Sequence, residues 1–354
     1  MTNRTMPKLL VLIIAALFAL LGCSQNQAVK KELPVQTPVT ERPIASSKLS
    51  WLKEREAMEK EPGQSTGDRE KVITSGDAIS KATESQKQSL VVRDGFALVV
   101  GISTYQHAGK SNLTNLIYAD EDARAFAKIL TRLGWSENRI KLLTNKEATQ
   151  RNVMLAIESW LTKAKQDDVI VFFWSGHGYP DPEDPEKVYF ACYDTDLSLP
   201  ATGYRMDHIR RSLEEKKAKN VIILADTCHA GKLITRGEKG ISIVPQIEKM
   251  SRDQNVPKGW IFMVGADSDR LAIEHSSWSN GAFTHSLIRG LEGAADGFMS
   301  SGSKDGFITL GELRTYMMSV MPEETQKVLG VAKHPVITTS SGDPHIWEIR
   351  LDRR

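Results

Sequence analysis

Two runs of apolar residues, each ending abruptly in polar and reactive side chains, limit the folds open to this chain. Residues 221–225 (VIILA) are followed by Asp-Thr-Cys-His-Ala-Gly, and residues 169–174 (VIVFFW) by Ser-Gly-His-Gly. Short continuous apolar runs bounded by turn-forming residues are typical of strands buried on both faces of a parallel sheet. Open α/β sheets bind ligands at the carboxyl ends of such strands, so we expect Cys228 and His177 to lie close together there.

Strand-like and helix-like segments alternate over most of the chain. Strands are predicted at 96–102, 140–143, 168–174, 188–192, 221–225, 260–266 and 346–349. Helices, recognised by apolar residues at helical spacing, are predicted at 118–133, 149–164, 204–217, 280–291 and 310–321. Strands that alternate with helices of this length imply right-handed βαβ crossovers, so we predict an α/β fold with a mainly parallel sheet.

The N-terminal segment has the organisation of a secretory leader. Arg4 and Lys8 precede the apolar stretch 9–21, which has signal-peptide length and is too short for a comfortable membrane span. The motif Leu20-Leu21-Gly22-Cys23 resembles the lipobox of bacterial lipoproteins. That resemblance implies removal of residues 1–22 and diacylation of Cys23. A plain secretory signal, or an anchor helix with an incidental cysteine, is the alternative.

Lipid on Cys23 would tie the protein to a membrane without a spanning helix. Ser24, rather than Asp, at the next position implies outer-membrane sorting by the same resemblance. We therefore expect a lipid-anchored protein of the cell envelope, on the periplasmic face of a membrane or outside the cell. Residues 23–92 are poor in aromatics and rich in Lys, Glu, Gln, Ser, Thr and Pro, which predicts a disordered tether before a domain at 93–354.

Charge and cysteine content argue against several classes of protein. The formal net charge is +2 and no Lys/Arg cluster stands out, so no nucleic-acid partner is expected. With Cys23 consumed by lipid, only Cys192 and Cys228 remain of the 3 cysteines, which is too few for a disulfide framework.

Cys228 and His177 form the candidate catalytic pair. Only a thiolate attacks a carbonyl group, so a cysteine nucleophile needs a neighbouring base or a lowered pKa, and His177 can supply this. Glycines on both sides of His177 offer backbone without packing side chains, which favours a substrate-facing loop. The N–H groups of Gly178 and Cys228 are the candidate oxyanion donors. By itself, Cys228 would indicate no more than an inert buried thiol.

The motifs Ser175-Gly176-His177-Gly178 and Asp226-Thr227-Cys228-His229-Ala230-Gly231 resemble those of caspase-like cysteine peptidases, in particular the bacterial relatives of metacaspases, the orthocaspases. Gly281-Ala282-Phe283-Thr284 matches a helix of the family's small subunit, and the resemblance extends over roughly residues 94–349. It implies a three-layer α/β/α sandwich around a mainly parallel sheet of about six strands. It also implies peptide-bond hydrolysis with Cys228 as nucleophile and His177 as acid and base.

An acidic pocket for Arg or Lys is implied by the same resemblance. The matching residues are Asp226, two positions before Cys228, Asp122 in the first helix, and Ser175, two positions before His177. A guanidinium group binds well to one or two carboxylates in a partly dry pocket. The alternatives are that Asp122 is a helix N-terminal carboxylate favoured by the helix dipole, and that Asp226 is a structural turn residue.

Metal binding and maturation stay open at this stage. The sequence requires no cofactor, and calcium activation has no clear ligand set, because the carboxylates around Asp296 and Asp305 lack EF-hand spacing. Residues 232–258 correspond to the family's loop between subunits, and their basic side chains would suit self-cleavage after Arg or Lys. A mobile surface loop is the alternative. The resemblance favours a monomer.

The leading interpretation is a lipid-anchored cysteine endopeptidase that acts on polypeptides after Arg or Lys. One alternative is a caspase-fold binding or signalling module with little turnover. Another is a related peptidase with Asp or Asn specificity.

Overall fold

The computed structural model describes residues 94–110, 112–227, 249, 256–265, 274–301, 304–340 and 344–353. All of them belong to one unit, Thr74–Arg354. The predicted leader and tether, Cys23, Cys228 and most of the loop 232–258 lie outside the described residues. Among the described helices, none is both long and apolar enough to cross a membrane.

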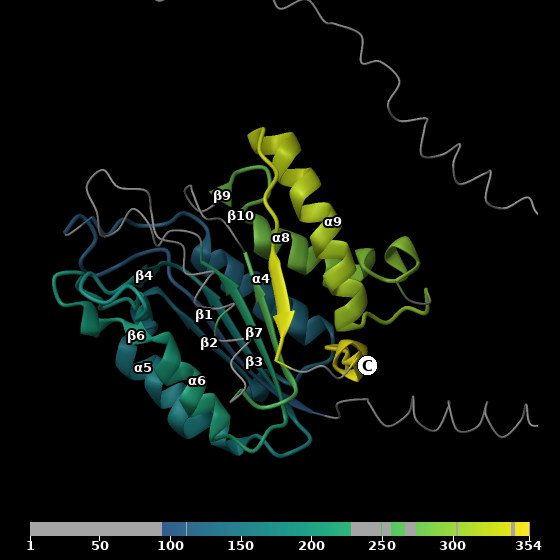
Figure 1. The fold of residues 1–354 in the computed structure, drawn as a ribbon, viewed down its shortest axis with the longest axis horizontal. Coiled ribbons are helices and arrows are strands. Elements are labelled where there is room, and N and C mark those ends of the chain that lie inside the picture. Colours follow the sequence, from purple (N-terminus) through teal and green to yellow (C-terminus); the bar gives the residue numbers. More distant parts are fainter. Residues whose placement is uncertain are drawn as a thin grey trace, which may run out of the picture. The chain divides into compact units, whose positions relative to one another are not determined.

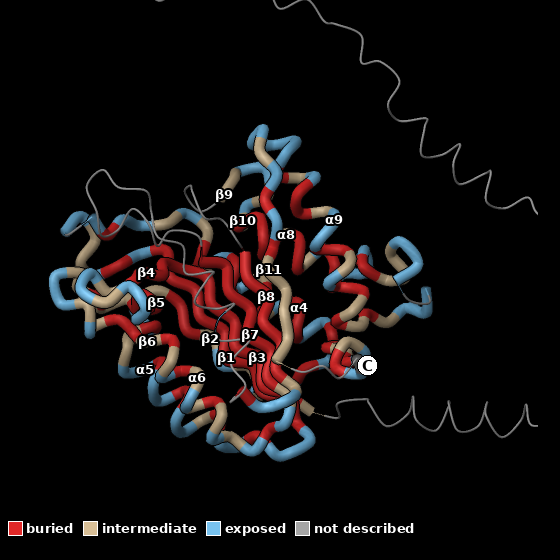
Figure 2. The backbone as a smooth tube through the Cα atoms, in the orientation of Figure 1, coloured by how far each residue is buried: buried red, intermediate tan, exposed pale blue. Residues whose placement is uncertain are grey.

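A six-stranded sheet forms the centre of the molecule (Figure 1). Its order across the sheet is β11 (Val336–Thr339), β8 (Trp260–Val264), β7 (Asn220–Asp226), β3 (Val169–Ser175), β1 (Gly95–Gly101) and β2 (Ile140–Thr144). The strands from β8 to β2 run parallel, and β11 pairs antiparallel with β8. Every residue of β1, β3 and β8 is buried, which explains their continuous apolar sequences (Figure 2).

Helices cover both faces of this sheet. On one face lie α5 (Gln150–Leu155) and α6 (Met206–Glu214), and on the other α4 (Ala119–Arg132), α8 (Ala282–Arg289) and α9 (Leu310–Leu329) (Figure 1). Successive residues of β1 enter different cores: Leu98 packs on the α5/α6 side and Val99 on the α4/α8/α9 side. The predicted three-layer arrangement is therefore confirmed.

Two small antiparallel sheets lie outside the central one. One contains β4 (Gly178–Pro180), β5 (Val188–Phe190) and β6 (Tyr204–Arg205), and the other is the hairpin of β9 (Glu274–His275) and β10 (Asn280–Gly281). The hairpin leads directly into α8, which begins at Ala282. Both small sheets flank the ends of strands that carry predicted site residues.

The closing strand predicted at 346–349 is wrong. Pro344–Glu348 forms a 3-10 helix, and the sixth strand is Val336–Thr339. Ile346 and Ile349 are both buried, and their spacing of three matches the 3-10 period. The strand predicted at 188–192 belongs to a small sheet instead of the central one, and α9 continues through Pro322 to Leu329.

Candidate active site

His177 lies two residues beyond the end of β3 and is completely buried. Its backbone N–H donates to the hydroxyl of Tyr105 at 2.9 Å, and the two rings lie 5.1 Å apart. Its ring Nε2 lies 2.8 Å from the carbonyl oxygen of Thr114. A carbonyl can only accept, so this contact assigns the proton to Nε2 and leaves Nδ1 as the basic nitrogen.

Burial lowers the pKa of His177 to about 4, although its hydrogen bond to Thr114 acts in the opposite direction. The imidazole is therefore neutral at physiological pH, the form in which Nδ1 can take a proton from a thiol.

Gly176 and Gly178 shape the backbone on either side of this histidine. A Cβ on Gly176 would lie 3.1 Å from both the Trp174 indole nitrogen and the Tyr105 hydroxyl, so glycine lets the loop pack closely there. Gly178 pairs with Phe190 of β5, and the N–H of Ala191 donates to the His177 carbonyl at 2.9 Å. This pattern makes the Gly178–Phe190 pair non-hydrogen-bonded, so the Gly178 N–H points away from β5. Pairing with β5 therefore does not use the N–H of Gly178, the residue predicted to supply an oxyanion donor.

The three residues predicted for the acidic pocket lie together. Ser175 and Asp226 are register partners at the ends of β3 and β7. The Ser175 hydroxyl donates to Asp122 Oδ2 at 2.8 Å from the first turn of α4. All three side chains are buried. The structure thus brings Asp122, Ser175 and Asp226 to the same edge of the sheet as His177.

The hairpin β9–β10 and α8 complete this cluster. Asp122 Oδ1 accepts from the Asn280 side chain at 2.9 Å and from the Gly281 N–H at 3.0 Å. Asp226 Oδ2 accepts from the backbone N–H of Thr284 at 3.1 Å and from its hydroxyl at 2.8 Å. A Cβ on Gly281 would collide with Asp226 Oδ2 and lie 3.2 Å from Asp122 Oδ2. Gly281 therefore lies against both carboxyl groups.

Two buried carboxyl groups this close resist simultaneous ionisation. Burial, followed by the negative charge of Asp226, raises the pKa of Asp122 well above its usual range. The hydrogen bonds from Asn280, Ser175 and Gly281 act in the opposite direction. A cation placed between the two carboxyl groups would favour the ionised form of both.

Tyr105, Thr114 and Asn280 contribute to the site although the sequence does not predict them, and Thr284 is predicted only as part of the motif Gly281-Ala282-Phe283-Thr284, without a role in the site. Thr114 contacts His177 through its backbone, which no side-chain pattern reveals. Asn280 and Thr284 flank the Gly281 segment and reach carboxylates more than fifty residues away in the chain. Cys228 follows Thr227, the last described residue of that segment.

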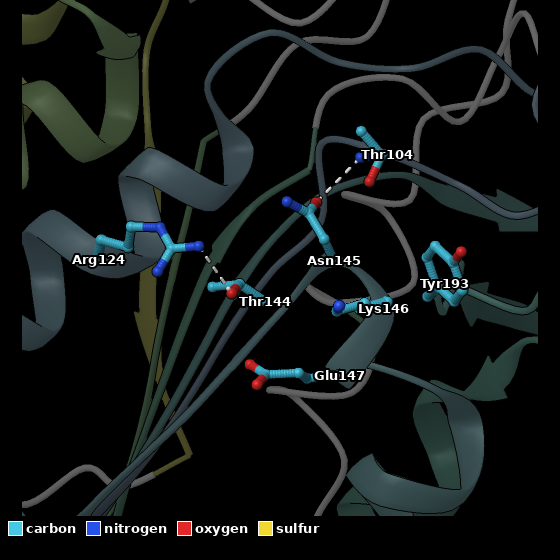
Figure 3. A pocket seen from close by; sticks show the side chains of 7 residues that line it. All are labelled: Thr104, Arg124, Thr144, Asn145, Lys146, Glu147 and Tyr193. Carbon is cyan, nitrogen blue, oxygen red and sulfur yellow. Dashed lines mark hydrogen bonds between the residues drawn. The ribbon is translucent and has the colours of Figure 1, made fainter.

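A separate hollow lies at the carboxyl ends of β1 and β2 (Figure 3). Its volume is about 450 Å³, and within it Arg124 donates to the Thr144 hydroxyl at 3.0 Å. Its lining consists of Thr104, Arg124, Thr144, Asn145, Lys146, Glu147 and Tyr193. The described residues of the candidate active site do not line it.

Within the described part of the chain, no group of three or more His, Cys, Asp or Glu side chains is arranged to hold a metal ion. The Asp296 carboxylate instead accepts from the N–H groups of Asp305 and Gly306, at 3.0 Å each.

The family model for the caspase domain matches residues 94–341, which is most of the chain. The chain belongs to the caspase-domain family. Metacaspase-6 of Arabidopsis thaliana is 28% identical over 172 residues, which cover 45% of this chain and 44% of that protein. Metacaspase-1 of Candida albicans is 24% identical over 268 residues, 64% of this chain and 58% of that protein. This caspase-domain chain thus spans about half the length of these curated relatives.

Solved structures also resemble this chain, at low sequence identity. A protein of Geobacter sulfurreducens gives a TM-score of 0.49 at 17% identity, covering 72% of this chain and 97% of that one. Caspase-1 from Spodoptera frugiperda gives a TM-score of 0.45 at 13% identity, covering 71% of this chain and 88% of that one. The caspase-like fold class rests on the sheet described above and on the family match.

Proposed function

We propose that this caspase-domain protein is a cysteine endopeptidase that cleaves polypeptides after Arg or Lys, with Cys228 as nucleophile and His177 as acid and base. One observation carries the proposal: Asp122, Ser175 and Asp226 form a single buried cluster at the sheet edge that carries His177. In the sequence, Cys228 follows Asp226 by two positions, as His177 follows Ser175, and Ser175 and Asp226 are the last residues of neighbouring parallel strands.

The neutral His177 takes the proton of the Cys228 thiol on Nδ1, and the thiolate attacks the carbonyl carbon of the scissile bond. The N–H groups of Gly178 and Cys228 donate to the oxygen that becomes negative. The C–N bond then breaks, and the leaving amine takes the proton from His177. Water, deprotonated by His177, attacks the thioester, and the carboxylic acid leaves as the thiol is restored.

The acidic cluster gives this reaction its expected selectivity. A guanidinium or ammonium group between Asp122 and Asp226 would oppose the burial and the repulsion by Asp226 that raise the pKa of Asp122. An acidic residue would instead add negative charge beside the two carboxyl groups. A buried ion pair of good geometry is worth more than one in water, and this favours Arg over neutral residues.

The sequence left two alternatives, a binding or signalling module and a related peptidase with Asp or Asn specificity. A binding module would need no catalytic proton transfer, yet Nε2 of His177 is held by Thr114 in the tautomer that leaves Nδ1 basic. A peptidase specific for Asp would need a cation near the pocket, whereas Asp122 and Asp226 are acidic.

The test is a panel of fluorogenic peptides ending in Arg, Lys, Asp or Asn, with Cys228→Ala as the control. We expect turnover of the Arg and Lys peptides alone and none by Cys228→Ala. Asp226→Ala should lower kcat/KM for Arg peptides by about a hundredfold, the scale of losing a buried charge pair. Turnover after Asp would contradict the pocket assignment, and hydrolysis of no peptide would favour the binding module. Running the panel with and without Ca²⁺ tests calcium activation.

The proposal extends to the place of action. The lipobox-like motif supports a chain anchored by lipid on Cys23 to the periplasmic face of a membrane or outside the cell, where a tether would let the domain reach polypeptides with basic residues. We propose that it acts as a monomer, without nucleic acid, and that the basic loop 232–258 is a substrate for self-cleavage.

A further inference from the structure

Glu274, the first residue of β9, accepts two hydrogen bonds from the start of α4. Its Oε1 accepts from the N–H of Tyr118 at 2.7 Å, and its Oε2 from the N–H of Ile117 at 2.8 Å. Tyr118 is the N-cap of α4, and its own side chain makes no capping bond. The Glu274 carboxylate therefore accepts from two backbone N–H groups at the N-terminal end of α4, where hydrogen-bond acceptors are needed and the helix dipole favours negative charge.

A second carboxylate contact joins the hairpin and α4, and in this one the carboxylate belongs to α4. Gly281 is the register partner of Glu274 in the hairpin, and its N–H donates to Asp122 Oδ1 of α4 at 3.0 Å. The hairpin thus holds the start of the helix through Glu274, and the helix holds the hairpin through Asp122. Each contact limits how far the other can move.

The segment held by Glu274 is also the one that orients the histidine. Thr114, three residues before Ile117, places its carbonyl oxygen 2.8 Å from His177 Nε2. The neighbouring Asn115 side chain accepts from the Tyr105 N–H at 3.0 Å. The Tyr105 hydroxyl in turn accepts from the backbone N–H of His177 at 2.9 Å. A shift of residues 114–118 would therefore move the acceptor of the His177 ring proton.

We propose that Glu274 is a positioning residue, which fixes residues 114–118 through Ile117 and Tyr118 so that the Thr114 carbonyl holds the His177 ring in the orientation for proton transfer. The proposal rests on the proposed peptidase function. Among the described residues, the segment is also held by neutral hydrogen bonds, such as the one from the Leu116 N–H to the Ser103 carbonyl at 2.8 Å. Glu274 adds two charge-assisted ones, which are about twice as strong.

The test compares Glu274→Ala and Glu274→Gln with Glu121→Ala in the full chain. Glu121 is an exposed acid in the same first turn of α4, paired with Arg124 at 3.7 Å, so its removal takes an equal charge from the same helix end. We expect Glu274→Ala to lower kcat for Arg peptides about ten- to a hundredfold, because small misplacements of catalytic groups have effects of this size. Glu274→Gln keeps one acceptor and should fall between Glu274→Ala and the wild type, and Glu121→Ala should match the wild type.

A second readout does not depend on turnover: the rate at which iodoacetamide alkylates Cys228, followed by mass spectrometry. Cys192 is fully buried, and burial raises the pKa of its thiol well above the usual range, so it resists the reagent. Glu274→Ala should slow alkylation near neutral pH about tenfold and leave it unchanged near pH 10, where the thiol ionises without help from His177.

Equal kcat and equal alkylation rates in Glu274→Ala and Glu121→Ala would overturn the proposal. If the alanine variant does not fold, the glutamine variant decides by the same two measurements. If the wild type cleaves no peptide, the proposed function fails, while alkylation at neutral pH still tests the positioning role.

Discussion

At the scale of single residues, Asp122 has a structural role in addition to its proposed role in substrate recognition. It holds Ser175, Asn280 and Gly281 through its two oxygens, and it faces the charge of Asp226. An acid whose pKa is raised by folding binds its proton more tightly in the native state. Its contribution to stability is therefore complete below the unfolded pKa of about 3.9, and it is lost as the pH rises through the folded pKa.

We expect Asp122→Asn to remove this pH-dependent loss. Asparagine resembles the protonated acid, since it can accept from Gly281 and donate to the Ser175 hydroxyl. Between about pH 5 and about pH 8, the Tm of the variant should fall by several degrees less than that of the wild type, since about 1 kcal/mol corresponds to roughly 2–4 °C in a domain of this size. Thermal unfolding across this pH range measures it, with Glu121→Gln as the exposed control. Parallel curves for the variant and the wild type would show that Asp122 is ionised in the folded protein.

The composition of the acidic cluster is predicted by the resemblance to metacaspases, which matches Asp122, Ser175 and Asp226 to the family's acidic pocket. The sequence does not predict the partners of the cluster. Thr114 and Asn280 act from 63 and 158 residues away from the groups they contact, and contacts at such separations depend on the tertiary fold.

At the scale of elements, the residue at the junction between β10 and α8 is restricted by the space available for a side chain and not by its backbone conformation. Gly281 is the N-cap of α8 with φ of −66°, a value that any residue adopts. What excludes a side chain is the carboxyl group of Asp226, which a Cβ would meet directly. The identity of this residue is therefore tied to the acidic cluster.

We expect Gly281→Ala to destabilise the domain by about 1–3 kcal/mol, as overpacking does, and to raise KM for Arg peptides by displacing both carboxylates. The matched control is Gly290→Ala at the end of α8, where a Cβ would lie 2.6 Å from Leu313 Cδ1, away from the cluster. It should lose comparable stability with KM unchanged. Denaturant unfolding and peptide kinetics on both variants measure this, and an equal KM in the two would separate Gly281 from substrate recognition.

At the scale of the whole molecule, the parallel strands of the sheet, including the edge strand β2, could be predicted, and the antiparallel edge strand β11 could not. The buried parallel strands have continuous apolar sequences, so β1, β3, β7 and β8 were found within a residue or two. Strand β11 is only partly buried along its length, and its short sequence lacks that signal. Helix α9 continues past Pro322 to Leu329, and beyond the proline the fully buried Thr325 donates its hydroxyl to the Met321 carbonyl at 2.8 Å.

The predicted anchor belongs to this scale as well, because it decides where the entire domain works. In cells that process lipoproteins, we expect the wild type in the membrane fraction, released by detergent, and Cys23→Ser in the soluble fraction, because acyl chains supply the binding. Cleavage of Arg peptides by the purified variant should equal that of the wild type. A Cys23→Ser protein that stays in the membrane fraction would favour the anchor-helix alternative.

Strands β7 and β8 are neighbours in the sheet although β7 ends at Asp226 and β8 begins at Trp260. Further contacts join the same two parts of the chain: Asp226 with Thr284, Asp122 with Gly281, and Tyr118 with Glu274. Cleavage of the chain once between these two strands would therefore leave the two fragments folded together as one domain. The two fragments would stay associated through these contacts, and each would carry part of the proposed recognition site, which neither could form alone.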